Sequence, residues 1–213
     1  MKYVQRGGPG IMFLRRKSKM EVHRMKFSFR NLLLCCFILV LATSSLVFAA
    51  SSPTLDEIGV KLKALGLLIG DPNGNMRFGD NITRAEFTAV AVRMIGKEAE
   101  ALSRKGATKF KDVDRTHWST GHINVSVENN LITGYPDNTF KLQRNITHAE
   151  ALTILVNALG YKDTVKGSNW PNNFIDKANE LGITKGITIK PSTPATRGDV
   201  ARMLNNSLTI PIK

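Results

Sequence analysis

Hydrophobic residues recur every three or four positions in three stretches beyond residue 50, and this spacing predicts an amphipathic helix in each stretch. The first helix should begin after Thr54, because Glu57 stands three residues later and the pair can form a capping box. It should end at Gly66, since glycine commonly closes a helix. The apolar positions of the three helices are Leu55, Ile58, Leu62 and Leu65; Ile123, Val127 and Leu131; and Phe174, Ala178 and Leu181, with Gly182 after the last.

A second helix should follow in each stretch, and each begins with the same polar signal. Thr83, Thr147 and Thr196 each have an acidic residue three positions later, namely Glu86, Glu150 and Asp199. Threonine and glutamate at this spacing form a capping box, in which Asp199 is a shorter substitute. The apolar faces that follow are Phe87, Val90, Ala91 and Met94; Leu152, Leu155, Val156 and Leu159; and Val200, Met203 and Leu204.

The chain beyond the N-terminus is therefore predicted to be three copies of one helix–loop–helix unit, a mainly α fold. We place the repeats at 50–105, 106–162 and 163–213, with connecting segments at 103–109 and 160–167. A single helix pair has too little apolar area to be stable alone, so the three units should share one core.

Residues 1–49 have the pattern of an export signal with a long basic preface. Basic residues precede an apolar run at 32–42, and small residues follow as far as Ala49. This order is typical of a secretory signal peptide, and we predict cleavage after Ala49. Cleavage one residue later is an alternative, and so is an uncleaved anchor, although a spanning helix needs about 20 apolar residues. Met20 and Met25 are alternative start positions.

The charge of the chain is concentrated at the N-terminus. The 213 residues carry 30 Lys and Arg against 17 Asp and Glu, a formal net charge of +13. Residues 1–49 hold nine of the basic residues and one acidic residue, which leaves a net charge of +5 in 50–213. This distribution does not favour a nucleic-acid partner. Cys35 and Cys36 are the only cysteines and lie in the predicted signal, so neither a disulfide framework nor a cysteine zinc site is expected.

Several motifs in these units resemble those of the S-layer homology family. The second unit contains Phe-Lys-Asp-Val at 110–113, His-Trp at 117–118 and Ile-Thr-Gly-Tyr-Pro-Asp-Asn-Thr-Phe at 132–140. Ile-Thr-Arg-Ala-Glu at 82–86 matches the signature stretch of the family without departure, and residues 169–171 (Asn-Trp-Pro) are a weak echo of the His-Trp pair. The resemblance covers essentially the whole chain beyond the signal, so we expect no separate enzymatic or scaffold domain.

The resemblance implies a cell-surface anchor of bacteria with Gram-positive-type walls. Three such repeats are expected to form a pseudo-threefold helical bundle that binds secondary cell-wall polysaccharide non-covalently, often through a pyruvylated sugar, without a cofactor. The ligand contacts of the family fall in grooves between neighbouring repeats. Carried over to this sequence, the contact positions are Arg84, Asp112, Trp118, Gly134 and Arg197, together with His148 where the family has arginine. The membrane would be involved only through the signal peptide before cleavage.

The chemistry of these residue types suits an acidic sugar. Arg84 should lie in the first turn of its helix, where free N–H groups and a partial positive charge favour a carboxylate such as a pyruvyl ketal. Trp118 can stack on the apolar face of a sugar, and Asp112 can accept hydrogen bonds from its hydroxyls. Histidine is mostly neutral at pH 7 and reaches less far than arginine. We therefore predict that the best groove combines Arg84, Asp112 and Trp118, and that the groove at His148 is weaker.

Two other classes of function are open to such a chain. An enzyme is not favoured, because the sequence has no His-Glu-x-x-His zinc helix, nucleophile elbow, P-loop or dinucleotide fingerprint. We therefore predict no catalytic activity. A secreted or membrane-tethered adaptor with a protein partner is the alternative, since packed helical hairpins can also present a protein-binding surface.

Overall fold

The computed structural model describes residues 52–213, and helices make up nearly all of the regular structure in this range. They are α2 Leu55–Ala64, α3 Arg84–Met94, α4 Glu98–Ser103, α5 Thr120–Glu128, α6 His148–Ala158, the 3-10 helix η1 Lys162–Thr164, α7 Asn172–Glu180 and α8 Arg197–Ser207. The mainly α fold is confirmed. The predicted signal peptide at 1–49 lies outside the described residues.

Four helices begin at the capping boxes that the sequence predicts. In α2, Oγ1 of Thr54 accepts a hydrogen bond from the N–H of Glu57, and the Glu57 carboxylate accepts one from the N–H of Thr54. Helices α3, α6 and α8 begin in the same way at Thr83, Thr147 and Thr196. Each box satisfies two backbone donors that a helix leaves unpaired, so the first residue of each of these helices is fixed.

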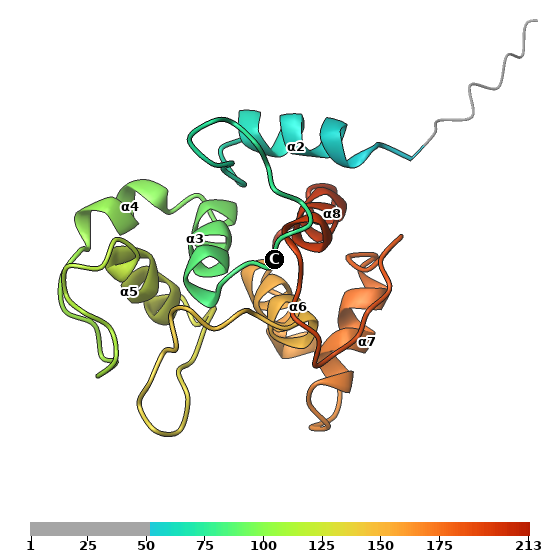
Figure 1. Cartoon of the computed structure of the whole chain (residues 1–213). Coiled ribbons are helices and arrows are strands. Elements are labelled where there is room, and N and C mark those ends of the chain that lie inside the picture. The colour runs from blue at the N-terminus through green and yellow to red at the C-terminus, as the bar shows by residue number, and fades with distance from the viewer. Residues whose placement is uncertain (1–51) are drawn as a thin grey trace, which may run out of the picture. The chain divides into compact units, whose positions relative to one another are not determined.

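Helices α3, α6 and α8 form the centre of the molecule (Figure 1). Their inner faces carry fully buried side chains, among them Phe87, Leu152, Leu155, Met203 and Leu204. The outer helices pack around them, with α5 on α3, α7 on α6 and α2 on α8. Each outer helix thus covers the inner helix of the preceding repeat, and the first repeat closes the ring on the third. This arrangement is the predicted pseudo-threefold bundle.

Three buried residues join the repeats in a ring of backbone hydrogen bonds. The N–H of Ile82 donates to the carbonyl of Ala195 at 3.2 Å, Ala195 donates to Ile146 at 2.8 Å, and Ile146 donates to Ile82 at 3.0 Å. All three residues are fully buried. Because every bond in the ring links two repeats, the loops that precede the inner helices are held in one register around the pseudo-threefold axis.

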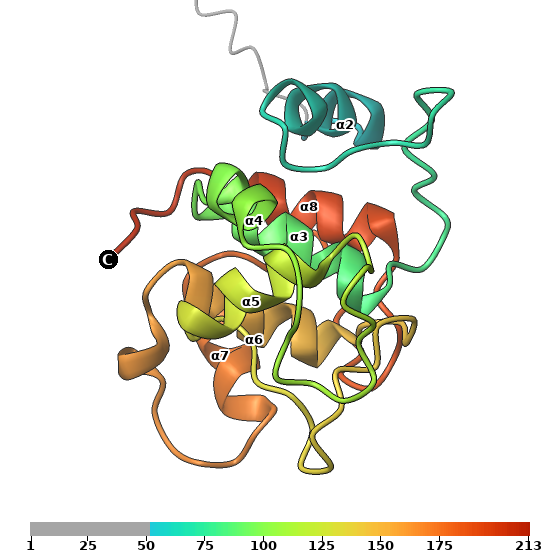
Figure 2. The same cartoon turned by 90° about the vertical axis from the view of Figure 1, so that its left-hand side faces the viewer.

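Helix α4 is an addition that the hydrophobic pattern does not predict. It lies over α5 (Figure 2), and the close approach requires Gly121, whose Cβ would collide with the carbonyl oxygen of Ala101. On the same side, Nε2 of His122 lies 2.9 Å from a carboxylate oxygen of Glu98. These contacts fix the start of α5 and therefore the position of Trp118 just before it.

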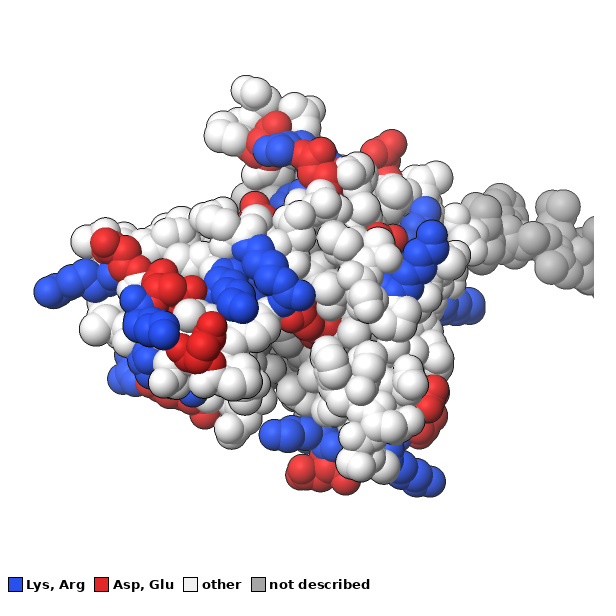
Figure 3. Space-filling model, turned by 60° about the horizontal axis from the view of Figure 1, so that its bottom comes forward, with Lys and Arg blue, Asp and Glu red and all other residues white. Residues whose placement is uncertain are grey.

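The charged side chains are dispersed over the surface that Figure 3 presents. Basic and acidic groups alternate there and are separated by uncharged areas, so this face has no extended patch of one sign. Nucleic-acid-binding domains usually carry such a basic patch. Within residues 52–213, no helix combines the length and apolar character that crossing a bilayer requires.

Candidate functional site

The loop before each inner helix packs on the N-terminus of another inner helix. The N–H groups of Arg84 and Ala85 donate to the carbonyls of Arg144 and Leu142, at 2.8 and 3.2 Å. The same two bonds recur from His148 and Ala149 to Thr193 and Pro191, and from Arg197 and Gly198 to Asp80 and Phe78. Together with the capping boxes, they occupy the donors that open each inner helix. The expectation of free N–H groups beside Arg84 is therefore wrong.

Arg84 is a buried residue whose side chain is 7% exposed. Its Nε donates to the carbonyl of Phe140 at 3.0 Å, and its Nη2 donates to the carbonyl of Thr133 at 2.7 Å. Burial lowers the pKa of Arg84, but an arginine remains charged at neutral pH. Its Nη1 faces a carboxylate oxygen of Glu150 at 3.9 Å. Arg84 thus holds the loop of the second repeat with two of its nitrogens. The third, Nη1, lies at the edge of that loop.

A pocket of about 370 Å³ opens beside Arg84, between the 130–135 loop, α6 and the start of α7. Gly134 and Trp170 are among the residues that line it. Trp170 is 55% exposed, and its Nε1 donates to Oγ1 of Thr153 at 3.1 Å, which fixes the indole. A fixed, accessible indole beside a buried cation can bind a sugar by stacking while the cation meets an acidic or hydroxyl group.

Arg197 repeats the geometry of Arg84 at the other side of the bundle. Its Nε donates to the carbonyl of Met76 at 2.8 Å, and its Nη2 donates to the carbonyl of Ile69 at 2.6 Å. A pocket of about 240 Å³ lies beside it and is lined by Gly70 and Trp118, among others. The two pockets are therefore equivalent by pseudosymmetry, each with a buried arginine, a glycine and an accessible tryptophan.

The predicted grouping of Arg84, Asp112 and Trp118 in one groove is wrong. Trp118 lies with Arg197, and the partner of Arg84 is Trp170. Asp112 lines neither pocket, because its two carboxylate oxygens accept hydrogen bonds from the N–H groups of Phe140 and Lys141, both at 2.7 Å. The physical reason is that Arg84 reaches into the loop of the second repeat, whose open side faces the start of the third.

Gly134 lines the Arg84 pocket, and packing also requires a glycine at this position. A Cβ there would collide with the ring of Phe110, which packs against Phe140 with ring centres 5.2 Å apart. The absence of a side chain therefore lets the loop lie directly on the phenylalanine pair.

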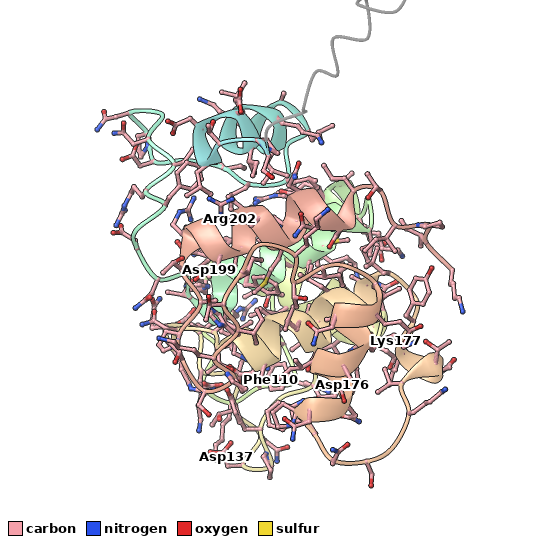
Figure 4. The ribbon with its side chains drawn as sticks, turned by 90° about the vertical axis from the view of Figure 1, so that its right-hand side faces the viewer. Phe110, Asp137, Asp176, Lys177, Asp199 and Arg202 are labelled. Carbon is pink, nitrogen blue, oxygen red and sulfur yellow. The ribbon has the colours of Figure 1, made fainter. Side chains whose placement is uncertain are left out.

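His148 occupies the third arginine position and is buried. Its Nδ1 accepts a hydrogen bond from the N–H of Lys190 at 3.0 Å, and its Nε2 lies 3.2 Å from a carboxylate oxygen of Asp199. Figure 4 shows Asp199 near the start of α8 and Arg202 further along the same helix. Both ring nitrogens have protein partners, so a ligand that contacts His148 would have to displace one of these bonds.

Glu150 is the acidic group at the Arg84 pocket. Its Oε1 accepts hydrogen bonds from the hydroxyl of Tyr135 at 2.9 Å and from Arg144 at 2.7 Å, and its Oε2 accepts one from the N–H of Thr147 at 2.9 Å. Burial opposes ionisation, but these hydrogen bonds outweigh it and hold the pKa of Glu150 below its ordinary value. The carboxylate is therefore charged at neutral pH, and it is shared by two arginines, Arg84 and Arg144.

The sequence motifs and this geometry agree with the family comparison. A family model described as the S-layer homology domain matches residues 61–88, 109–152 and 160–201, which together make up more than half of the chain. The chain belongs to the S-layer homology family. The resemblance carried by its motifs is thereby confirmed.

Several similar proteins are surface or anchoring proteins by name. A middle cell wall protein of Brevibacillus brevis is 42% identical over 81% of this chain and 17% of its own length. A surface layer protein of Brevibacillus choshinensis is 37% identical over 81% of this chain and 16% of its own length. A cellulosome-anchoring protein of Acetivibrio thermocellus is 30% identical over 66% of this chain and 35% of its own length.

These comparisons support the predicted location at the cell surface of a Gram-positive-type bacterium. The chain spans less than a fifth of the length of the two Brevibacillus proteins. The relatives are mostly surface and anchoring proteins, and one that matches over a shorter region is named an endoglucanase, of which the match covers 13%.

Trp170 is the pocket residue whose sequence signal was weakest. Residues 169–171 echo the His-Trp pair at 117–118, and the echo becomes meaningful only when the outer helices are aligned on their starts. The sequence predicts only a capping role for Glu150, yet this residue also lines the Arg84 pocket. One residue can serve both roles, because Oε2 of Glu150 caps the helix while its Oε1 accepts hydrogen bonds from Tyr135 and Arg144 at the pocket wall.

The lowered pKa values of Glu150 and Asp199 predict a loss of stability in acid. Burial opposes ionisation of both groups and is outweighed, chiefly by the hydrogen bonds of the capping boxes and their neighbours. A depressed folded pKa stabilises the protein above the unfolded pKa, near 4.5 for glutamate and 3.8 for aspartate, and this contribution is lost as the pH falls through the folded values. Urea unfolding between about pH 6 and about pH 3 should show a falling free energy of unfolding.

Two variants test the source of this pH dependence. Glu150→Gln should flatten the fall, whereas Asp176→Asn, at an exposed position on α7, should leave it in place. An unaltered pH dependence in Glu150→Gln would contradict the assignment.

Proposed function

We propose that this S-layer homology chain anchors the polypeptide that carries it to the bacterial wall, by binding secondary cell-wall polysaccharide non-covalently at Arg84 and at Arg197. The observation that carries the proposal is the recurrence of one arrangement in two equivalent pockets. Packing accounts for the buried arginines and glycines. It gives no reason to keep a large indole half exposed beside each of them, whereas a carbohydrate ligand does.

The ligand that suits these pockets is an acidic sugar, with a pyruvylated unit as the specific candidate. Each arginine uses Nε and Nη2 for loop carbonyls, which leaves Nη1 for a carboxylate. In Arg84 this nitrogen lies 3.9 Å from Glu150, too far for a hydrogen bond. A charge-assisted hydrogen bond of this kind contributes about 1.5–3 kcal/mol. Two grooves on one rigid core also allow two units of a repeating polymer to be held at once, which raises the overall affinity.

We further propose that these grooves bind without catalysing a reaction. The carboxylates that line them, Glu150 and Glu86, each accept hydrogen bonds from the N–H and hydroxyl of the threonine that caps their helix. A general acid or base must exchange a proton with the substrate. A carboxylate fixed as a helix cap is poorly placed to do so.

Trp170→Ala and Trp118→Ala are each expected to weaken binding to native wall sacculi about tenfold, and the double variant should abolish it. Both indoles are accessible, so the free energy of unfolding should change little. The measurement is a sedimentation assay with native sacculi and with sacculi stripped of secondary polysaccharide by acid. Binding should be confined to the native material.

Leu102→Ala is the matched control, because Leu102 is an equally exposed apolar residue that lines neither pocket. It should bind as the wild type does. Equal binding of the wild type to native and stripped sacculi would overturn the polysaccharide proposal and indicate a protein partner.

A further inference from the structure

A second pocket shares Trp170 with the Arg84 pocket. It has a volume of about 210 Å³ and is lined by Arg144, Thr147, Glu150, Trp170, Pro171 and Ser192, among others. Trp170 and Glu150 also line the Arg84 pocket, so the two hollows are neighbours that share one indole and one carboxylate. Small-molecule sites are usually larger than about 300 Å³, so the second pocket is too small for an extended ligand alone but suits one unit of a chain.

The charges around Trp170 leave a positive excess. Glu150 is the single carboxylate that serves both Arg84 and Arg144, so one unit of positive charge is not neutralised by this cluster. Arg84 is buried, but the Arg144 side chain is 42% exposed and lies at the rim of the second pocket. An anionic group in this pocket would therefore meet an accessible guanidinium.

The equivalent place beside Trp118 has a different arrangement of charges. Arg144 and Asp80 are pseudosymmetric positions, because their carbonyls accept the first-turn hydrogen bonds of Arg84 and Arg197 respectively. Asp80 forms an ion pair with Arg77, and Glu86 stands where Glu150 stands in the other repeat. Arg93 lines the Trp118 pocket but is itself paired with Glu98 at 3.2 Å. An aspartate that is paired with Arg77 thus stands here in the place of the accessible Arg144.

We propose that the Arg144 pocket is a second subsite that accepts an acidic unit of the same glycan chain whose neighbouring unit occupies the Arg84 pocket. The inference rests on the proposed function of the Arg84 groove. Trp170 lines both pockets and can therefore contact both units. The groove at Trp170 consequently binds two consecutive sugar units and favours a carboxylate on the second. The groove at Trp118 binds a single unit.

Titration calorimetry of the purified protein with secondary wall polysaccharide fragments from Brevibacillus brevis tests this subsite. The fragments are sorted into a short set of one repeating unit and a longer set, and a portion of each is carboxyl-reduced. The wild type should bind the longer fragments about tenfold more tightly than the short ones, and carboxyl reduction should remove that gain. Arg144→Gln should remove the same gain and leave the affinity for short fragments unchanged.

Ser192→Trp tests the subsite without altering Arg144, whose hydrogen bond to Glu150 also supports the cap of α6. Ser192 is exposed at the pocket wall, and no hydrogen bond of its side chain occurs in residues 52–213, so the bulky substitution should fill the pocket without loss of stability. Gln143→Trp is the matched control, because Gln143 is the exposed position that corresponds to Ser192 in the loop of the second repeat.

Ser192→Trp should abolish the length-dependent gain, and Gln143→Trp should preserve it. A gain that survives Ser192→Trp, or short and long fragments that bind equally to the wild type, would overturn the subsite and leave the proposed function intact. A wild type that binds no fragment at all would overturn both.

Discussion

Replacing Arg84 with alanine is expected to lower the free energy of unfolding by about 3 kcal/mol, in addition to any effect on ligand binding. The substitution removes the donors that satisfy the carbonyls of Phe140, which is buried, and of Thr133, which is partly exposed. An orphaned buried acceptor costs about 1–3 kcal/mol, and an accessible one costs less because water can replace the donor. It also removes a guanidinium that lies 4.9 Å from the centre of the Phe140 ring. Urea unfolding followed by tryptophan fluorescence measures the change.

Matched substitutions separate this structural role from a general effect of lost charge. Arg197→Ala should be destabilising to a similar degree, because Arg197 makes the equivalent bonds to Met76 and Ile69. Arg115→Ala, at an exposed position, should change stability by less than about 0.5 kcal/mol. If Arg84→Ala left stability unchanged, the bracing role would be refuted. A binding defect in Arg84→Ala therefore cannot by itself assign a ligand contact, and the tryptophan variants are the cleaner test.

The sequence was sufficient to predict the helices because their starts depend on local chemistry. A threonine and an acidic residue three positions apart define a capping box within one helical turn, and all four predicted boxes are present. The recurrence of this signal also predicted the repeat and the shared core. Helix α4 escaped prediction because no side-chain cap bond marks its start at Lys97, and its six residues are too few for a periodic pattern.

The composition of the grooves could not be predicted in this way, because it depends on which repeat covers which. The pattern identified Arg84 and Trp118 correctly as members of repeated motifs, but it could not show that Arg84 reaches into the loop beside Trp170. It also could not show that a neighbouring loop occupies the N–H groups at the start of α3. Both features are contacts between residues far apart in the sequence. A short motif carries no information about which repeat lies across the interface from it.

The departure of His148 from the arginine of the family has a structural reason in the length of the loop. The loops that Arg84 and Arg197 hold run 18 positions, from the residue that ends an outer helix to the first residue of the next inner helix. The loop that His148 holds runs only 15 positions between the same two points. The two arginines donate to carbonyls, whereas His148 accepts the N–H of Lys190. A shorter loop lies closer to the helix, so a shorter side chain reaches it. The side chain at position 148 thus matches the loop that it holds.

Ile146→Ala is expected to lower the free energy of unfolding by about 3 kcal/mol and to destabilise the three repeats together. Ile146 is fully buried, and its backbone belongs to the hydrogen-bonded ring that joins it to Ile82 and Ala195. A cavity at this point lies against all three inner loops, so no repeat can keep its packing while another loses it. Ile212→Ala is the control, because Ile212 is 65% exposed and should contribute little.

Fluorescence of the two tryptophans can show whether the loss is shared. Trp170→Phe leaves Trp118 as the single reporter, and Trp118→Phe leaves Trp170, in a different pocket. In the Ile146→Ala background both reporters should give one coincident urea transition, shifted equally to lower urea concentration. Separate transitions would mean that the repeats unfold independently and that the ring does not couple them. Coincidence would mean that neither groove exists without the whole bundle, so a ligand in one groove must stabilise the other.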